Sequence, residues 1–271
     1  MRKLNYILLI ILITSCITKK EKSTVTLNGQ KIQIELIDLD KDLDFTGYGA
    51  TKKDGELESL AYYKNGEIID TLYSFHKNGE IKEKGLVKDN YKFGWWSEYD
   101  SKGRKVSETE YRTEKDQLYK NQVYYYDSNG NVKIEPSSYY ELDIPDTIKI
   151  GRNLARVKNY ETSFNDRESN LLTVIVDNQY SDSIIKKDSF SDGTMKPFFG
   201  IYGYKEGNQI VKGIIEEKII SEIDRKGDSS TFSLEMHHKY FEKEVYVWNK
   251  QKYSKSGLRI SKQMEVEYEN N

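Results

Sequence analysis

The chain has 271 residues, enough for one or two domains, with 32% charged residues and a mean hydropathy of −0.78. Its formal charge is only −2, and this argues against nucleic-acid binding, which needs a clustered basic face. Aromatic residues make up 13% of the chain, including 22 tyrosines, whereas disordered chains are poor in aromatics. We therefore predict a folded, tyrosine-rich, mainly β protein.

The N-terminus has the pattern of an export signal. Met1–Lys3 is basic, and the mainly apolar run at 4–13 is shorter than the roughly 20 residues that span a bilayer. Residues 1–15 therefore predict a secretory signal peptide. Cys16, the single cysteine of the chain, follows immediately and has no second cysteine with which to form an internal disulfide.

The stretch Leu12-Ile13-Thr14-Ser15-Cys16 resembles a bacterial lipobox. The resemblance implies that Cys16 becomes the acylated first residue of the mature protein, because two hydrophobic chains suffice for stable membrane attachment. The expected location is then the bacterial cell envelope, on either the periplasmic or the surface face. The polar residues 16–23 predict a tether. The alternative for Cys16 is a buried cysteine that happens to follow a signal.

A hairpin and an acidic run follow the tether. Residues 25–34 predict two strands with Asn28-Gly29 at the tip. Four aspartates then fall on alternate positions between 38 and 44, which suggests a calcium site. An EF-hand loop that starts at Asp38 would need glycine at 43 and a carboxylate at 49, but these positions hold Leu43 and Gly49. We therefore predict a solvated loop and no metal site.

A short phrase repeats between residues 62 and 130: an aromatic residue, a few polar residues, a glycine, then charges. Asn-Gly and Asp-Gly favour type I′ hairpin turns, so the phrase predicts a β-hairpin repeat. One hairpin is marginal in water, whereas stacked hairpins share aromatic faces. Residues 24–135 are therefore predicted as a stacked hairpin sheet with packed aromatic residues. The glycines of the repeat are Gly55, Gly66, Gly79, Gly103 and Gly130, and the aromatics expected to pack as a ladder are Trp95, Tyr99, Tyr124 and Tyr126.

Residues 91–99 alternate between aromatic and polar, as expected for a half-buried strand. Tyr91, Phe93 and Trp95 share one face, and Trp96 breaks the pattern. Exposed aromatic residues are common at binding surfaces. Packing at the rim of the sheet is the expected role of Trp96, and contact with a partner through an exposed ring is the alternative.

The pattern Gly94-x-Trp96, followed by Tyr99-x-x-x-Gly103, resembles the variant MORN repeat and the YwqK family, and the resemblance covers about residues 55–135. Members of that family are often labelled antitoxins, which implies an antitoxin-like or immunity role. A lipid-anchored protein outside the cytoplasm cannot reach a cytoplasmic toxin. The resemblance therefore implies an exported toxin that is met at the envelope.

From residue 139 to 271 the character changes to longer apolar strands with fewer glycine turns, which predicts a β-sandwich-like domain. The run at 210–223 is compatible with a helix, but its β-branched residues favour a strand. The expected strands lie at 146–150, 154–157, 171–176, 198–204, 210–223, 232–248 and 258–268.

The sequence contains no catalytic constellation. His237 and His238 are adjacent, so on a strand they point to opposite faces, and His76 lies beside a turn. No zinc-protease, nucleophile-elbow or phosphate-loop motif is present. We predict a non-catalytic binding protein without cofactor or metal, whose partner is a protein or an envelope polymer. The alternatives are a structural component of envelope assembly and a carbohydrate-active enzyme.

Overall fold

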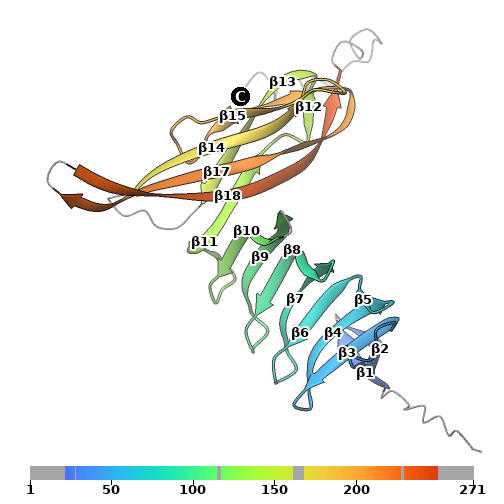
Figure 1. Ribbon diagram of the computed structural model, residues 1–271. Coiled ribbons are helices and arrows are strands. Elements are labelled where there is room, and N and C mark those ends of the chain that lie inside the picture. The colour runs from blue at the N-terminus through green and yellow to red at the C-terminus, as the bar shows by residue number, and fades with distance from the viewer. Residues whose placement is uncertain (1–21, 28, 115–116, 161–167, 227–228, 250–271) are drawn as a thin grey trace, which may run out of the picture. The chain divides into compact units, whose positions relative to one another are not determined.

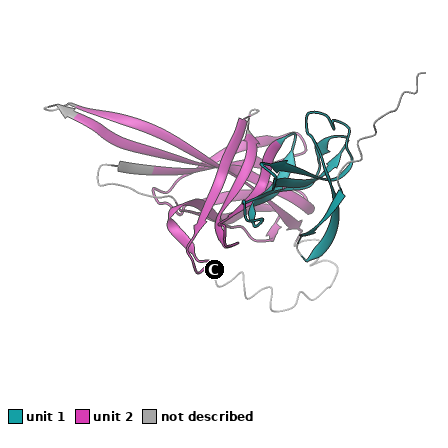
Figure 2. Ribbon diagram, turned by 90° about the horizontal axis from the view of Figure 1, so that it is seen from below, with its two compact units in different colours: residues 1–90 teal, residues 91–271 magenta. Residues whose placement is uncertain are grey.

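In the computed structural model (Figure 1), every element of the described residues is a β-strand, which confirms the mainly β class. The description covers residues 22–27, 29–114, 117–160, 168–226 and 229–249. The expected signal peptide, Cys16, most of the tether and the strand expected at 258–268 lie outside it. The chain divides into two compact units, Met1–Asn90 and Tyr91–Asn271, which Figure 2 colours separately.

The first unit is one sheet with the strand order β1-β2-β3-β4-β6-β7, and β5 pairs with β4. All pairings are antiparallel except that of β2 with β3. Its buried apolar side chains cluster around Leu60 and around Tyr63. The strands are β1 (Lys22–Leu27), β2 (Gln30–Leu36), β3 (Gly47–Lys53), β4 (Glu56–Lys64), β5 (Glu67–Ile68), β6 (Thr71–Phe75) and β7 (Ile81–Lys88).

The repeated phrase forms hairpin turns, but of two kinds. At Asp54-Gly55 and Asn65-Gly66 both residues have positive φ and the loop has two residues, as in type I′ turns. The other turns are wider. In these, the amide of Gly79, Gly103 or Gly130 donates to the carbonyl three residues before it, and only the glycine has positive φ. This geometry is a type I turn followed by a glycine bulge.

The wider turns use an aspartate where the sequence offers one. The Oδ1 atom of Asp100 accepts hydrogen bonds from the amides of Lys102 and Arg104 at 2.9 and 3.0 Å. These backbone bonds, together with that from the Arg104 side chain, lower the pKa of Asp100 to about 2. The Oδ1 atom of Asp127 accepts the equivalent pair of amides. The Tyr-Asp-Ser-x-Gly copies are therefore fixed by their own side chains.

In the second unit, strands in the order β8-β9-β10-β11-β13-β16 form one series, and a second sheet has the order β12-β18-β17-β14-β15. Fourteen buried apolar residues from both sheets form one core, including Val157, Val174, Phe199 and Phe241, as predicted for a sandwich. The strands are β8 (Tyr91–Tyr99), β9 (Lys105–Glu114), β10 (Gln117–Tyr126), β11 (Val132–Asp143), β12 (Thr147–Lys149), β13 (Gly151–Tyr160), β14 (Glu168–Gln179), β15 (Ile185–Phe190), β16 (Phe198–Gly203), β17 (Gly207–Lys226) and β18 (Ser229–Trp248).

Strand β11 joins the repeat strands to the sandwich without a break. It pairs with β10 from Val132 to Ser138, and with β13 from Tyr139 to Asp143. The boundary inferred from the sequence, between 135 and 139, therefore falls inside one strand, and the compact units divide at Asn90 and Tyr91. The last hairpin strands and the sandwich accordingly belong to one unit, which contains the surfaces described below.

Candidate binding surface

Trp96 is buried, with 3% of its surface exposed, so the alternative that it is an exposed partner contact is wrong. Its ring packs edge-on against Tyr111, with 6.5 Å between ring centroids, and the Lys92 ammonium lies 4.2 Å from the Trp96 ring. A cation over an indole face is a favourable contact. Trp96 therefore has a packing role, and the contact role inferred from its exposure does not apply to it.

The exposed side of β8 is the aromatic one. Tyr91, Phe93 and Trp95 are all more than 40% exposed. The alternation along β8 is confirmed: the aromatic series faces solvent, and the exception, Trp96, faces the interior. The cause is that the buried side already has a partner for an indole in Tyr111 of β9.

Four aromatic rings form a continuous row that we call the aromatic strip: Trp95, Tyr124, Tyr139 and Tyr160. Trp95 of β8 reaches over β9 to Tyr124 of β10, with ring centroids 5.6 Å apart. Tyr124 lies 4.4 Å from Tyr139 of β11, and Tyr139 stacks on Tyr160 of β13 at 4.5 Å and 11°. Trp95 and Tyr124 confirm part of the predicted ladder, whereas Tyr139 and Tyr160 were not predicted.

The strip is neutral and hydroxyl-bearing at physiological pH. Burial raises the pKa of Tyr124 to about 12, and the neighbouring Tyr139 and Glu141 add to the shift. Burial also raises the pKa of Tyr139. The carboxylate of Glu108 borders the strip, where it accepts a hydrogen bond from Tyr126 at 2.6 Å. Trp95 is exposed, Tyr124 and Tyr160 are half-buried, and Tyr139 is buried between its neighbours, so the strip presents mainly its Trp95 end to a partner.

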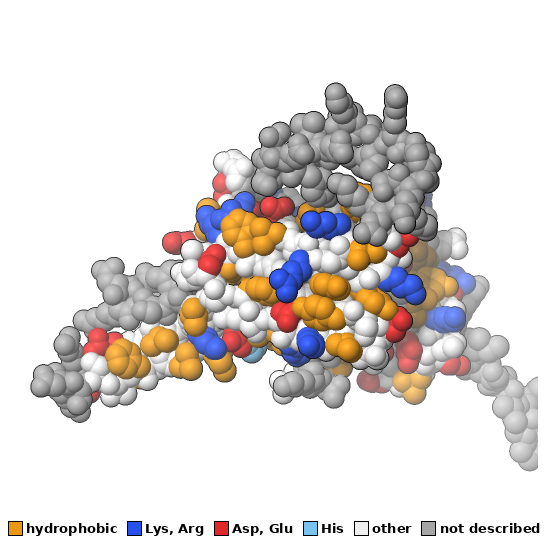
Figure 3. Space-filling model, turned by 90° about the horizontal axis from the view of Figure 1, so that it is seen from above, with side chains coloured by type: hydrophobic (Ala, Val, Ile, Leu, Met, Phe, Trp, Pro, Cys, Tyr) orange, Lys and Arg blue, Asp and Glu red, His pale blue; other side chains and the backbone are white. Residues whose placement is uncertain are grey.

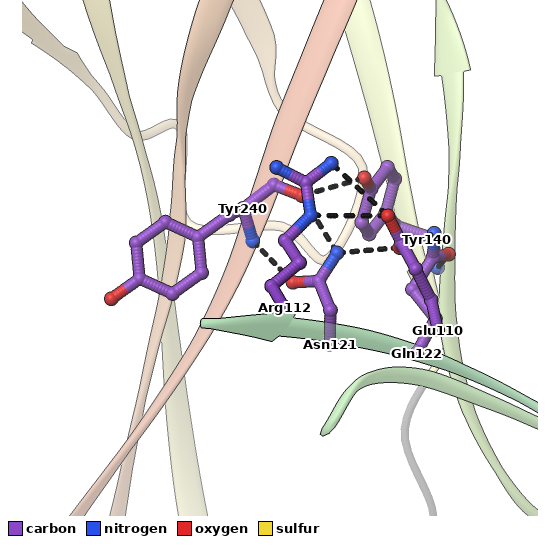
Figure 4. A network of polar contacts seen from close by, with 6 residues as sticks. All are labelled: Glu110, Arg112, Asn121, Gln122, Tyr140 and Tyr240. Carbon is purple, nitrogen blue, oxygen red and sulfur yellow. Dashed lines mark hydrogen bonds and ion pairs between the residues drawn. The ribbon is translucent and has the colours of Figure 1, made fainter. Parts of the chain in front are cut away.

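A buried polar network lies next to the strip (Figure 4). Glu110 of β9 is the cross-strand neighbour of both Trp95 and Gln122. One of its carboxylate oxygens pairs with Arg112 at 3.0 Å, and the other accepts hydrogen bonds from Asn121 at 2.6 Å and Gln122 at 2.9 Å. A carboxylate with this many partners is held in place, and we assign Glu110 a structural role rather than an acid–base role.

Asn121 links this network to the second sheet. The register of β10 on β9 shifts between Lys120 and Gln122, so Asn121 is the extra residue of a bulge and its side chain leaves the ladder. Its side-chain nitrogen donates to the backbone carbonyl of Tyr240 at 2.8 Å, and its side-chain oxygen accepts from the backbone amide of Tyr240 at 2.6 Å. Tyr140 donates to the same carbonyl. These side chains satisfy backbone groups where, among the described residues, β18 has no second strand beside it, since β12 pairs with Tyr246–Trp248.

The histidines and the acidic run of the described residues bond to nearby side chains or backbone groups. No group of three or more His, Cys, Asp or Glu side chains is arranged among the described residues to hold a metal ion. His238 pairs with Glu216 at 3.1 Å, and His237 lies 3.8 Å from Glu235, so the two histidines have separate partners. The acidic run bonds to itself: the amide of Asp38 donates to Asp42, and Lys41 pairs with Asp38. The described residues contain no helix that is long and apolar enough to cross a membrane.

A second exposed surface lies on the long β17–β18 hairpin, which extends away from the core of its unit (Figure 1). Figure 3 shows apolar side chains along this arm. Ile220 lies opposite Leu234 across the hairpin, and Phe232 and Met236 alternate with polar residues on the Leu234 strand. These side chains are all exposed. Four exposed apolar side chains on one hairpin make this arm a candidate contact surface.

Comparison with known proteins gives no relative: neither a family model nor a curated protein nor a solved structure matches this chain.

Proposed function

We propose that the protein is a lipid-anchored component of the bacterial cell envelope that works by binding, and that the aromatic strip is its contact surface. The observation that carries the proposal is the strip itself, four rings from four strands with Trp95 exposed at its end. Rigid aromatic side chains supply much contact area at little entropic cost, so they dominate interface energetics. A protein partner fits these residues best.

The resemblance of residues 55–135 to the YwqK family supports an antitoxin-like or immunity role for this contact. In that case the partner is an exported toxin. The strip is built on strands, and the Glu110–Asn121 network fixes β9 and β10 beneath it. A surface fixed in this way suits tight binding, because little order has to be gained on contact.

Photo-crosslinking from the strip tests this proposal. A photoreactive phenylalanine analogue at position 95 should give a discrete adduct with another protein in intact cells. The same analogue at Leu118, an exposed residue of β10, is the control and should give no such adduct. The Tyr124→Ala substitution should remove the adduct, because Tyr124 is the ring against which Trp95 packs. Identical adducts from both positions would count against the strip.

A structural role in envelope assembly is the second candidate, and the β17–β18 hairpin favours it. In β18, residues 229–236 have a ladder partner on one side only among the described strands. Two copies of such a strand can pair antiparallel about Leu234, which places Phe232 of one copy opposite Met236 of the other. This candidate predicts that the photoreactive analogue at Leu234 gives an adduct of two copies of the chain.

Membrane attachment is predicted to depend on Cys16. Wild-type protein should pellet with membranes, and Cys16→Ser should not, because the lipid anchor attaches through the thiol. Cell fractionation measures the difference. Protease treatment of intact cells then distinguishes the surface face, where the protein is digested, from the periplasmic face. Soluble wild-type protein in the cytoplasm would refute the anchor and favour an intracellular antitoxin.

A further inference from the structure

A pocket of about 630 Å³ opens between the edge strands of the two sheets of the Tyr91–Asn271 unit, away from the aromatic strip. Its volume falls within the range of small-molecule sites, roughly 300–1,000 Å³. Figure 3 shows apolar, basic and acidic side chains interspersed on the face seen from above. Its lining includes Arg152, Asn178, Tyr180, Asp188, Gly200 and Tyr202.

The walls are aromatic and the floor is a glycine. Phe198, Gly200 and Tyr202 share one face of β16 by alternation, so the glycine leaves a gap between two rings. A side chain at Gly200 would come within 3.1 Å of the Phe190 ring, which enters from β15. Tyr180 lies against Tyr202, with ring centroids 4.5 Å apart. A flat ring of ligand size would have an aromatic face on which to pack.

The polar groups of the pocket are positioned by hydrogen bonds. Asp188 accepts from Tyr180 at 2.5 Å and from Asn178 at 2.8 Å, both on Oδ2, so Oδ1 is left to accept from a ligand. The Asn178 side chain is itself fixed, because its nitrogen donates to the backbone carbonyl of Gly200 and its oxygen accepts from the backbone amide of Tyr202. These hydrogen bonds, and then the charges of Lys186 and Arg152, hold the pKa of Asp188 below its usual value.

One basic side chain lines the pocket, and two more lie beside its aromatic residues. Lys186 lies 5.8 Å from the Tyr180 ring centroid, and the Arg156 guanidinium lies 4.8 Å from that of Phe198. Arg152 lines the pocket as the cross-strand neighbour of Tyr202. The charges of Lys186 and Arg152 both act on the Asp188 carboxylate, so an ammonium ligand is disfavoured and the donor to Asp188 Oδ1 is best supplied by a hydroxyl group. An arginine beside an aromatic wall is suited to a ligand carboxylate.

We propose that this pocket binds a hexuronic acid unit, a hydroxylated pyranose ring that carries one carboxylate. The C–H face of the ring packs on Tyr202, a ring hydroxyl donates to Asp188 Oδ1, and the carboxylate pairs with Arg152. No bond is made or broken. This site stands independently of the aromatic strip and of the protein partner proposed for it.

Saturation-transfer NMR on the detergent-solubilised full chain tests the proposal with three matched monosaccharides: glucuronate, glucose and glucosamine. Glucuronate should bind at least about tenfold more tightly than either of the others, since only it offers Arg152 a charge-assisted bond. Tyr202→Ala should abolish the signal. Arg152→Gln should reduce the preference over glucose to near unity, whereas Lys187→Gln, which removes an exposed charge of β15 outside the pocket lining, should leave it unchanged.

Absence of glucuronate binding, equal binding of glucose, or preference for glucosamine would overturn the proposal. Glucuronate binding that survives Arg152→Gln unchanged would overturn it too. If Tyr202→Ala fails to fold, Arg152→Gln and Tyr180→Phe decide the question. Arg152 is exposed, and Tyr180→Phe keeps the aromatic wall while it removes the hydroxyl that positions Asp188.

Discussion

Gly66→Ala should destabilise the Met1–Asn90 unit by about 3 kcal/mol or more. A Cβ atom at this position would lie 1.9 Å from the carbonyl oxygen of Leu43, a backbone atom that cannot rotate away. The φ angle of +78° adds strain for any residue with a side chain. The loop cannot easily retreat, because the amide of Gly66 donates to Phe45 and that of Asn65 donates to Thr46.

The chain supplies its own control for this substitution. Residues 64–67 and 77–80 have the same four letters, Lys-Asn-Gly-Glu, but a Cβ atom at Gly79 would meet nothing within 4 Å. Gly79→Ala should therefore cost only the positive-φ strain, about 1 kcal/mol. Urea unfolding followed by far-UV circular dichroism compares the two variants. Equal costs would show that the Leu43 carbonyl is not packed on the turn as described.

Asn121→Ala should destabilise the Tyr91–Asn271 unit by about 3 kcal/mol, because it leaves buried hydrogen-bonding groups without partners. The side chain is 1% exposed and bonds to Glu110 and to both backbone groups of Tyr240. Tryptophan fluorescence is a direct measure, since Trp95, Trp96 and Trp248 all belong to this unit. Asn129→Ala, at an exposed turn, should stay within about 0.5 kcal/mol of wild type.

Asn121→Asp adds a pH test of the same contact. The new carboxylate would lie beside that of Glu110, whose oxygen is 2.6 Å from the present amide nitrogen. Repulsion between the two carboxylates raises the pKa of the new carboxyl in the folded protein above its value in the unfolded chain. The variant therefore binds a proton on folding and loses stability as the pH rises. Its deficit relative to wild type should therefore shrink between pH 7 and pH 5. A pH-independent deficit would argue against the contact.

The sequence predicts the local part of this fold well. Glycine turns, alternation and β-branched runs locate the hairpins and most sandwich strands, because these signals depend only on neighbouring residues. Strand β15 was not predicted, since Lys186, Lys187 and Asp188 give an exposed edge strand no apolar pattern. The type of each turn could not be predicted from the pattern either, because the identical sequences at 64–67 and 77–80 form loops of different length.

The candidate surface depends on contacts between distant residues, which explains why only half of it was predicted. Trp95 and Tyr124 belong to the repeat, but Tyr139 and Tyr160 join the strip only because β11 passes into the sandwich and pairs with β13. The pocket likewise needs Asn178 of β14 to bond to the edge strand β16. A periodicity argument cannot place such pairs, because no local pattern relates residues so far apart in sequence.

Cysteine labelling at the strip tests its proposed contact role most directly, and it requires no knowledge of the partner. Phe93→Cys places a thiol two residues from Trp95, Leu118→Cys serves as the matched exposed control, and wild type, with Cys16 alone, gives the background. In purified protein the two new thiols should react with maleimide at similar rates. In intact cells Phe93→Cys should react several-fold more slowly than Leu118→Cys, because a partner covers the strip. An unchanged ratio of the two rates in cells would contradict the account.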